Sequence, residues 1–188
     1  MSSKPTYLGL LNAVAVAELG GESLFKAWAA VTPNEDVRAL LQTVALREAE
    51  HARSFAKRID ELGYSVLSKD DPGLPERIAT AKSKKLTDRE KFEKFGLTYR
   101  RKGADIFTRF FNDMTIDIQT GELLGRYISE ERDTGRRLKA CYDGLLAAEN
   151  GSSGKSTKAP NAPAPPKKLT SSRSVKRTSS AASRAKSA

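Results

Sequence analysis

The chain has little cysteine and little histidine: among its 188 residues, Cys141 and His51 are the only ones. A single cysteine excludes an intramolecular disulfide. Leu138, Tyr142 and Leu145 follow the helical spacing around Cys141, which indicates that the thiol packs against the core rather than reacting. With one histidine, any transition-metal site in this chain must depend mainly on carboxylates.

Long apolar runs and a recognisable export signal are also missing. The longest apolar stretch, residues 8–16, is interrupted by Asn12 and is too short to span a bilayer. Residues 1–4 do not open a cleavable signal peptide. We therefore expect a cytoplasmic protein without a membrane span.

Acidic residues are absent from the last 38 positions, although the chain has 23 of them. Residues 151–188 consist mostly of Ser, Ala, Pro, Thr and Gly, with too few apolar side chains to offset the entropy of folding. We expect two parts: a folded domain over 1–150 and a disordered basic tail over 151–188. The tail carries nine basic residues: Lys155, Lys158, Lys167, Lys168, Arg173, Lys176, Arg177, Arg184 and Lys186.

The first 150 residues have the periodicity of an all-α domain. Apolar residues recur at three- and four-residue steps, and Pro, Asn, Thr and Gly stand where helices begin or end. The pattern predicts long helices over about 5–32, 34–62, 88–114 and 118–148. It also predicts a connecting loop over 64–73 and a short amphipathic segment over 74–81.

One pair of residues carries the chemical signal. His51 follows Glu48 by three residues, and at helical spacing the carboxylate and the imidazole project from the same face. Glu18 and Glu131 stand on the core-facing stripes of two other predicted helices, where an unpaired charge is costly. Carboxylates with one imidazole suit iron or manganese. Glu18, Glu48, His51 and Glu131 are therefore the predicted metal ligands.

This arrangement resembles the ferritin-like superfamily, which includes ferritins, bacterioferritins and rubrerythrins. The resemblance rests on Glu18 in the first helix and on Glu48 and His51 in the second, and it covers residues 5–148. It implies an antiparallel four-helix bundle with a long crossover and a di-iron site. It also implies a bacterial, rubrerythrin-like protein that oxidises ferrous iron or reduces peroxide.

The second half of the chain departs from the family pattern. The expected third helix has Tyr99 and Gly103 at its central stripe positions, where the family has a glutamate. In the fourth helix, Glu131 is followed three residues later by Thr134 rather than by histidine. The ligand set is therefore incomplete. The chain also lacks the paired cysteines with which rubrerythrins bind a second iron centre.

Two functions of different classes fit these residues. In one, the domain is a metalloprotein, with Tyr127 or Tyr99 beside the metal as a hydrogen-bonding or redox partner. In the other, it is a degenerate bundle without metal, a scaffold or oligomerising unit that presents the tail. The tail resembles linker-histone tails and the basic extensions of DNA-protecting mini-ferritins, which implies weak, salt-dependent binding to nucleic acid. A solubilising role, and binding to an anionic protein or membrane surface, are the alternatives.

Overall fold

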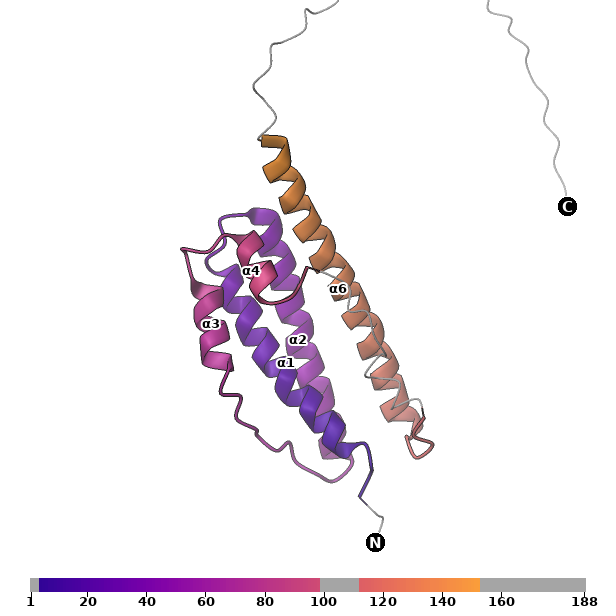
Figure 1. Ribbon diagram of the computed structural model, residues 1–188. Helices are drawn as coiled ribbons and strands as arrows, with labels where there is room; N and C mark the ends of the chain where they lie inside the picture. The colour runs from indigo at the N-terminus through magenta and orange to yellow at the C-terminus, as the bar shows by residue number, and fades with distance from the viewer. Residues whose placement is uncertain (1–3, 99–111, 153–188) are drawn as a thin grey trace, which may run out of the picture. The chain divides into compact units, whose positions relative to one another are not determined.

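The computed structural model describes residues 4–98 and 112–152, which form five helices and contain no strand (Figure 1). The all-α prediction is confirmed for this part of the chain. The chain divides into two units, 1–155 and 156–188, and the second lies outside the described residues. The helices are α1 Leu8–Ala29, α2 Glu35–Glu61, α3 Leu74–Lys82, α4 Asp88–Lys94 and α6 Ile118–Ser152.

The first two helices pack together along their length as an antiparallel pair. The Asn34 side chain caps α2 by accepting hydrogen bonds from the amides of Asp36 and Val37, as its place before the helix predicts. After α2, Gly63 adopts φ 82°, a left-handed conformation that favours glycine. The Tyr64 amide donates back to the Ile59 carbonyl across this turn, which ends the helix where the sequence predicts.

The last helix, α6, packs against α2 and runs antiparallel to it. Two cross-links set this direction: Arg58 pairs with Asp117 at 2.8 Å, and Arg47 pairs with Asp133 at 2.9 Å. The arginines are eleven residues apart, close to three helical turns, so they share one face of α2. The segment between the two cross-links includes Glu48 and His51.

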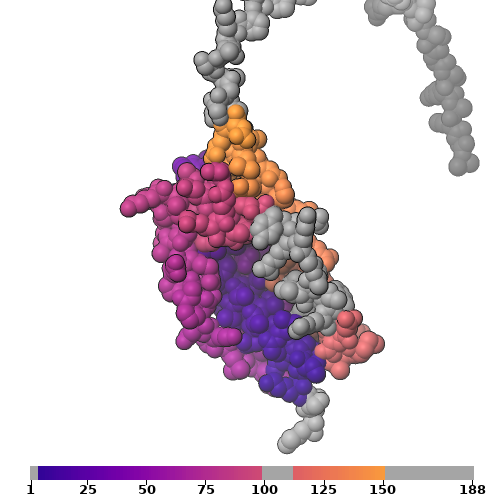
Figure 2. Space-filling model, in the orientation of Figure 1, coloured from indigo at the N-terminus to yellow at the C-terminus, as the bar shows by residue number. Residues whose placement is uncertain are grey.

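The connection between α2 and α3 is fastened to α1. Asn12 forms two hydrogen bonds with the backbone of Leu67, donating through Nδ2 at 3.0 Å and accepting through Oδ1 at 2.7 Å. The short helix α3 then packs on α1, as the predicted amphipathic segment requires. In Figure 2 the α3–α4 segment, in magenta, lies against α1, in indigo.

The prediction of a long third helix over 88–114 is wrong in its extent. Its start is correct, because Thr87 and Glu90 form a capping box at the predicted position. The helix then ends after two turns at Lys94, where Gly96 adopts φ 66°. The Leu97 amide donates to the Phe92 carbonyl at 2.9 Å, the bond that closes a left-handed helix terminus.

The remaining positions of that predicted helix are either outside the described residues or non-helical. Tyr99, Gly103, Ile106, Phe107 and Phe110 belong to the first group. Met114, expected on the core stripe, lies in a non-helical segment with 94% of its surface exposed.

By length and composition, α1 is apolar enough to cross a membrane, with a mean hydropathy of 1.3 over its best window. The helix extends the apolar stretch 8–16, which is too short to span a membrane by itself. This is weak evidence for a span, because the core helix of a soluble protein passes the same test. Here α1 packs on α2 and buries Glu18.

The described core consists of two apolar clusters separated along the helices. The first gathers the N-terminal half of α1, the C-terminal half of α2 and the start of α6, around Leu11, Phe55 and Leu124. The second gathers the opposite halves, around Trp28, Leu41 and Leu138, together with α3 and α4. Between them lies a group of ionisable residues, which we call the polar layer: Glu18, Glu48, His51, Glu130 and Glu131.

Candidate metal centre

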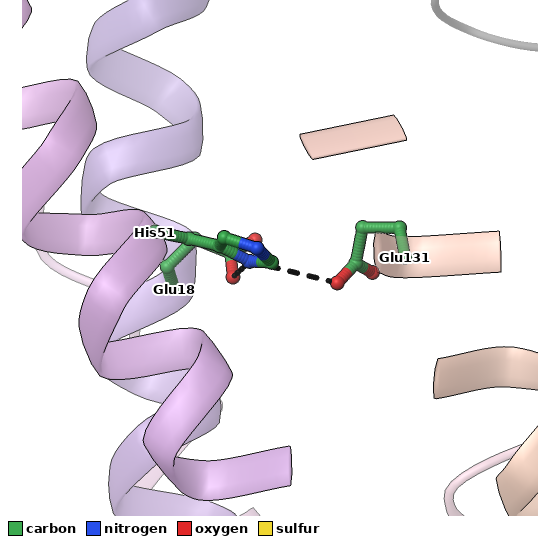
Figure 3. Close-up of side chains that lie close together, drawn as sticks. All are labelled: Glu18, His51 and Glu131. Carbon is green, nitrogen blue, oxygen red and sulfur yellow. Dashed lines mark hydrogen bonds and ion pairs between the residues drawn. The ribbon is translucent and has the colours of Figure 1, made fainter. Parts of the chain in front are cut away.

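Three of the four predicted ligands meet within the polar layer. Glu18 of α1, His51 of α2 and Glu131 of α6 each offer a ligand atom, and these atoms lie within 4.8 Å of one another. Figure 3 shows Glu18 and His51 together on the α1–α2 pair, with Glu131 facing them from α6. Helical periodicity explains the meeting, since each residue stands on the core-facing stripe of its helix.

Both ring nitrogens of His51 face carboxylates. Nδ1 lies 3.2 Å from Oε2 of Glu18, and Nε2 lies 2.7 Å from Oε2 of Glu130. Burial by itself would lower the pKa of His51, but the hydrogen bonds to Glu18 and Glu130 outweigh it and raise the pKa. Without metal, each ring nitrogen of His51 therefore has a carboxylate as its hydrogen-bond partner.

Tyr127 completes the contacts of Glu18. Its hydroxyl donates to Oε1 of Glu18 at 2.8 Å, and its ring lies edge-on to His51 with 4.9 Å between ring centroids. Burial, together with the nearby charge of Glu18, raises the pKa of Tyr127, so the phenol keeps its proton and remains a donor. Its predicted place beside the site is confirmed, whereas Tyr99 lies outside the described residues.

Glu48 is buried beside the three-residue group but is not part of it. Its carboxyl group lies against the backbone of Gly21 on α1. Burial and the neighbouring carboxylates of Glu18 and Glu131 raise the pKa of Glu48 to about 9, so at neutral pH the group is protonated and bonds to Glu18 as a neutral acid. Of the four predicted ligands, Glu48 is therefore the one outside the group of closely spaced ligand atoms.

Glu131 is the residue of the polar layer that lacks a hydrogen bond on one carboxylate oxygen. Its Oε1 is buried and forms no hydrogen bond, and it lies 3.7 Å from Nδ1 of His51. Burial, with the repulsion of Glu18, raises the pKa of Glu131 to about 7. A buried carboxylate oxygen without a partner is costly, because nothing replaces the water it has lost.

Glu130 is the site residue that sequence reasoning missed. Its neighbours Arg132, Arg136 and Arg137 suggest a solvent edge, and Asp133 does lie there, paired with Arg47 and Arg137. Glu130 instead accepts from Nε2 of His51 and is also paired with Arg126 at 3.0 Å. No sequence signal marks Glu130 for this role, because adjacent residues on a helix point about 100° apart and Glu131 is the one on the core-facing stripe.

The polar layer has more acid than base. It contains four carboxyl groups and one imidazole, and the nearest basic side chains, Arg47 and Arg126, reach it only from its edge. At neutral pH the metal-free protein offsets part of this charge with a proton on Glu48, whereas Glu131, with a pKa of about 7, is protonated only in part. Such a layer has the capacity for a cation that would replace those protons.

The candidate nucleic-acid residues cannot be placed in the same way. All nine lie outside the described residues: Lys155, Lys158, Lys167, Lys168, Arg173, Lys176, Arg177, Arg184 and Lys186. Binding of nucleic acid by this tail stays a prediction, based on nine positive charges without an acidic residue among them.

Comparisons with known proteins assign no family to the chain: no protein-family model matches it, and neither does any curated protein or solved structure. The ferritin-like resemblance therefore depends on the chain's own residues, above all on Glu18, Glu48 and His51.

Proposed function

We propose that this chain is a ferritin-like metal-binding protein that holds iron or manganese between α1, α2 and α6. Its activity, in this proposal, is the oxidation of ferrous iron or the reduction of peroxide. The expected four-helix bundle, with its long crossover, is the scaffold that we propose for the site.

The observation that carries the proposal is the buried oxygen of Glu131 that has no hydrogen bond, beside His51 and Glu18. Three ligand atoms from three helices lie within 4.8 Å of one another, and one of them, Oε1 of Glu131, is buried without a hydrogen bond. A bound cation would give this oxygen its missing partner. It would also neutralise the repulsion that raises the pKa of Glu48 and Glu131.

The donor set favours particular metals. Two carboxylates and one imidazole suit iron and manganese, whereas sites that select softer metals use thiolates. Glu18, Glu131 and Nδ1 of His51 would hold the ion, and iron bound there would supply one-electron redox chemistry. Glu130, on Nε2, would keep the ring oriented with Nδ1 toward the ion, as carboxylates behind metal-bound histidines commonly do.

The competing function also has an observation in its favour. Both ring nitrogens of His51 have a hydrogen-bond partner without metal, Glu18 on Nδ1 and Glu130 on Nε2. A degenerate bundle that serves as a scaffold would look like this. It would leave a buried oxygen of Glu131 with a 3.7 Å ion pair to His51 but without a hydrogen bond, which is why we place the metal site first.

An anaerobic titration of the purified full-length chain with ferrous iron tests the proposal. We expect saturable binding in the parent protein and loss of binding in Glu131→Gln, because the amide cannot replace the carboxylate as a ligand. Glu22→Gln is the matched control: Glu22 lies one turn from Glu18 on α1 but pairs with Lys26 near the surface. It should bind iron as the parent does.

Absence of binding by the parent would exclude the metalloprotein and favour the scaffold. Equal binding by Glu131→Gln and the parent would place the metal elsewhere. Exposure of the iron-loaded protein to oxygen or peroxide, followed by absorbance, then tests the redox activity separately from binding.

A further inference from the structure

The Glu48 carboxyl group occupies a space on α1 that exists because residue 21 is glycine. A Cβ atom added to Gly21 would lie 2.1 Å from Oε2 and 2.9 Å from Cδ of Glu48. Both separations are far shorter than van der Waals contact. No residue with a side chain fits there while Glu48 keeps its present position, and we call this space the Gly21 niche.

The backbone at this position has no need of glycine. Gly21 lies within the regular helix α1 and does not adopt a positive φ. Glycine inside a helix costs roughly 1 kcal/mol relative to alanine. The neighbouring Gly20 differs, since a Cβ there would make only ordinary contacts with Leu74, the nearest at 3.5 Å. Of this pair, only Gly21 makes room for a carboxyl group.

The surroundings determine where Glu48 goes when it leaves the niche. One turn beyond the niche lie the apolar side chains of Phe25 on α1 and Val44 on α2, both in the second core cluster. One turn in the other direction lie Glu18 and His51. A carboxyl group gains nothing among apolar side chains, so its favourable exit is toward the metal ligands.

We propose that the Gly21 niche sets how many carboxylates bind the metal. While Glu48 is in the niche, the site offers Glu18, His51 and Glu131. When Glu48 leaves it, the same site gains a third carboxylate. This inference rests on the proposed metal site and assigns Gly21 as a positioning residue that acts on the metal through Glu48.

Cobalt titration of two neighbouring glycine variants tests this inference. Cobalt(II) is stable in air, and its visible spectrum reports its ligands. Gly20→Ala and Gly21→Ala change the same helix by the same methyl group, but only the second fills the niche. We expect Gly21→Ala to bind cobalt on the order of tenfold more tightly than Gly20→Ala, with a changed spectrum. Adding Glu48→Gln to each variant should abolish the difference.

The outcomes separate this inference from the proposed function. If the parent and Gly20→Ala bind cobalt but Gly21→Ala binds equally or more weakly, the niche does not control the site. If neither the parent nor the variants bind, the proposed function itself fails. Thermal unfolding followed by circular dichroism checks folding: Gly20→Ala should melt at or above the parent's temperature, and Gly21→Ala should unfold in a single cooperative transition.

A crystal structure of metal-free Gly21→Ala gives a second readout that does not depend on metal binding. In the parent the Glu48 carboxyl group already bonds to Glu18, so in the variant we expect it to have left the backbone of residue 21 and to have turned further toward His51. A carboxyl group that points into solvent, or an α1 helix that has moved away to keep Glu48 in place, would overturn the inference.

Discussion

Two polar clusters join α2 to α6, and they meet the cost of burying charge in different ways. One is the polar layer. The other, which we call the Arg58 cluster, lies at the end of α2 and the start of α6 and consists of Arg58, Glu61, Asp117, Gln119 and Thr120, with Tyr7.

In the Arg58 cluster every charge has several partners. The two oxygens of Asp117 accept four hydrogen bonds between them, from Arg58, the Tyr7 hydroxyl, and the amide and hydroxyl of Thr120. Burial would raise the pKa of Asp117, but these hydrogen bonds outweigh it and hold the pKa far below its ordinary range. The carboxylate is stable where it stands.

In the polar layer the balance is reversed. The pKa of Glu48 rises to about 9 and that of Glu131 to about 7, and Oε1 of Glu131 has no hydrogen bond. The same two helices therefore hold one cluster that is complete and one that is not. This contrast indicates that the polar layer's excess of acid is a property of that site rather than of buried charge in this fold.

Removing Arg58 should have the largest effect on stability. In Arg58→Ala, Asp117 keeps its hydrogen bonds from Tyr7 and Thr120 but loses its counter-charge. We expect the free energy of unfolding to fall by about 3 kcal/mol. This is the lower end of the range for a buried ion pair, because the Asp117 side chain is 37% exposed. Urea denaturation measures the loss. Arg53→Ala is the control: Arg53 is 68% exposed and pairs with Glu50, so its loss should cost less than about 0.5 kcal/mol. Equal effects would mean that the Arg58 cluster does not hold the helices together.

The two clusters should respond to pH in opposite directions. Glu48 and Glu131 have pKa values raised above the ordinary 4.5, so the folded protein binds more protons than the unfolded chain, and this stability is lost as pH rises from about 5 to 9. The raised pKa of His51 acts in the same direction. Asp117, with a lowered pKa, contributes above its ordinary 3.8 and loses that contribution only in stronger acid.

Urea denaturation with a chelator at pH 5, 7 and 9 measures this dependence. We expect a loss of at least about 2 kcal/mol in the metal-free protein across that range. Glu48→Gln should make this loss smaller, because the amide has no proton to lose while Glu131 and His51 still titrate. A metal-free protein that is equally stable at all three pH values would contradict the charge imbalance of the layer.

Neutralising one acid in each cluster should give the smallest effects, and they should have opposite signs. Glu131→Gln removes a charge that repels Glu18, and we expect it to stabilise the metal-free protein by about 1 kcal/mol at pH 8. Asp117→Asn removes a charge that Arg58 stabilises, and it should destabilise by about 1 kcal/mol. Thermal unfolding of both variants decides the point, and effects of the same sign would remove the distinction between the clusters.

The helix ends were predictable where local chemistry determines them. Asn34 and Thr87 cap their helices through hydrogen bonds to amides two or three residues away, so the signal lies within a few letters of sequence. Gly96 has a local signal as well, but it also fits the three- and four-residue spacing of a core stripe. Its positive φ makes it a helix terminus, and periodicity alone does not separate the two meanings.

The candidate site was predictable in part for a similar reason. Periodicity places Glu18, His51 and Glu131 on core-facing stripes, and the structure brings them together. Glu130 could not be distinguished from a surface residue, since adjacent residues on a helix differ by about 100° and the rotation of α6 relative to α2 decides which side chain reaches His51. The niche at Gly21 likewise depends on the distance between two helices.

The division of the core into two apolar clusters has a consequence for how the protein opens. Trp28, Leu41 and Leu138 contact one another on one side of the polar layer, and Leu11, Phe55 and Leu124 on the other. Among the described residues no apolar side chain belongs to both clusters, and we expect that either group can lose its packing while the other keeps its own. The long helices therefore join two local units of stability, and local unfolding of one unit would let water into the layer while the other unit stays folded.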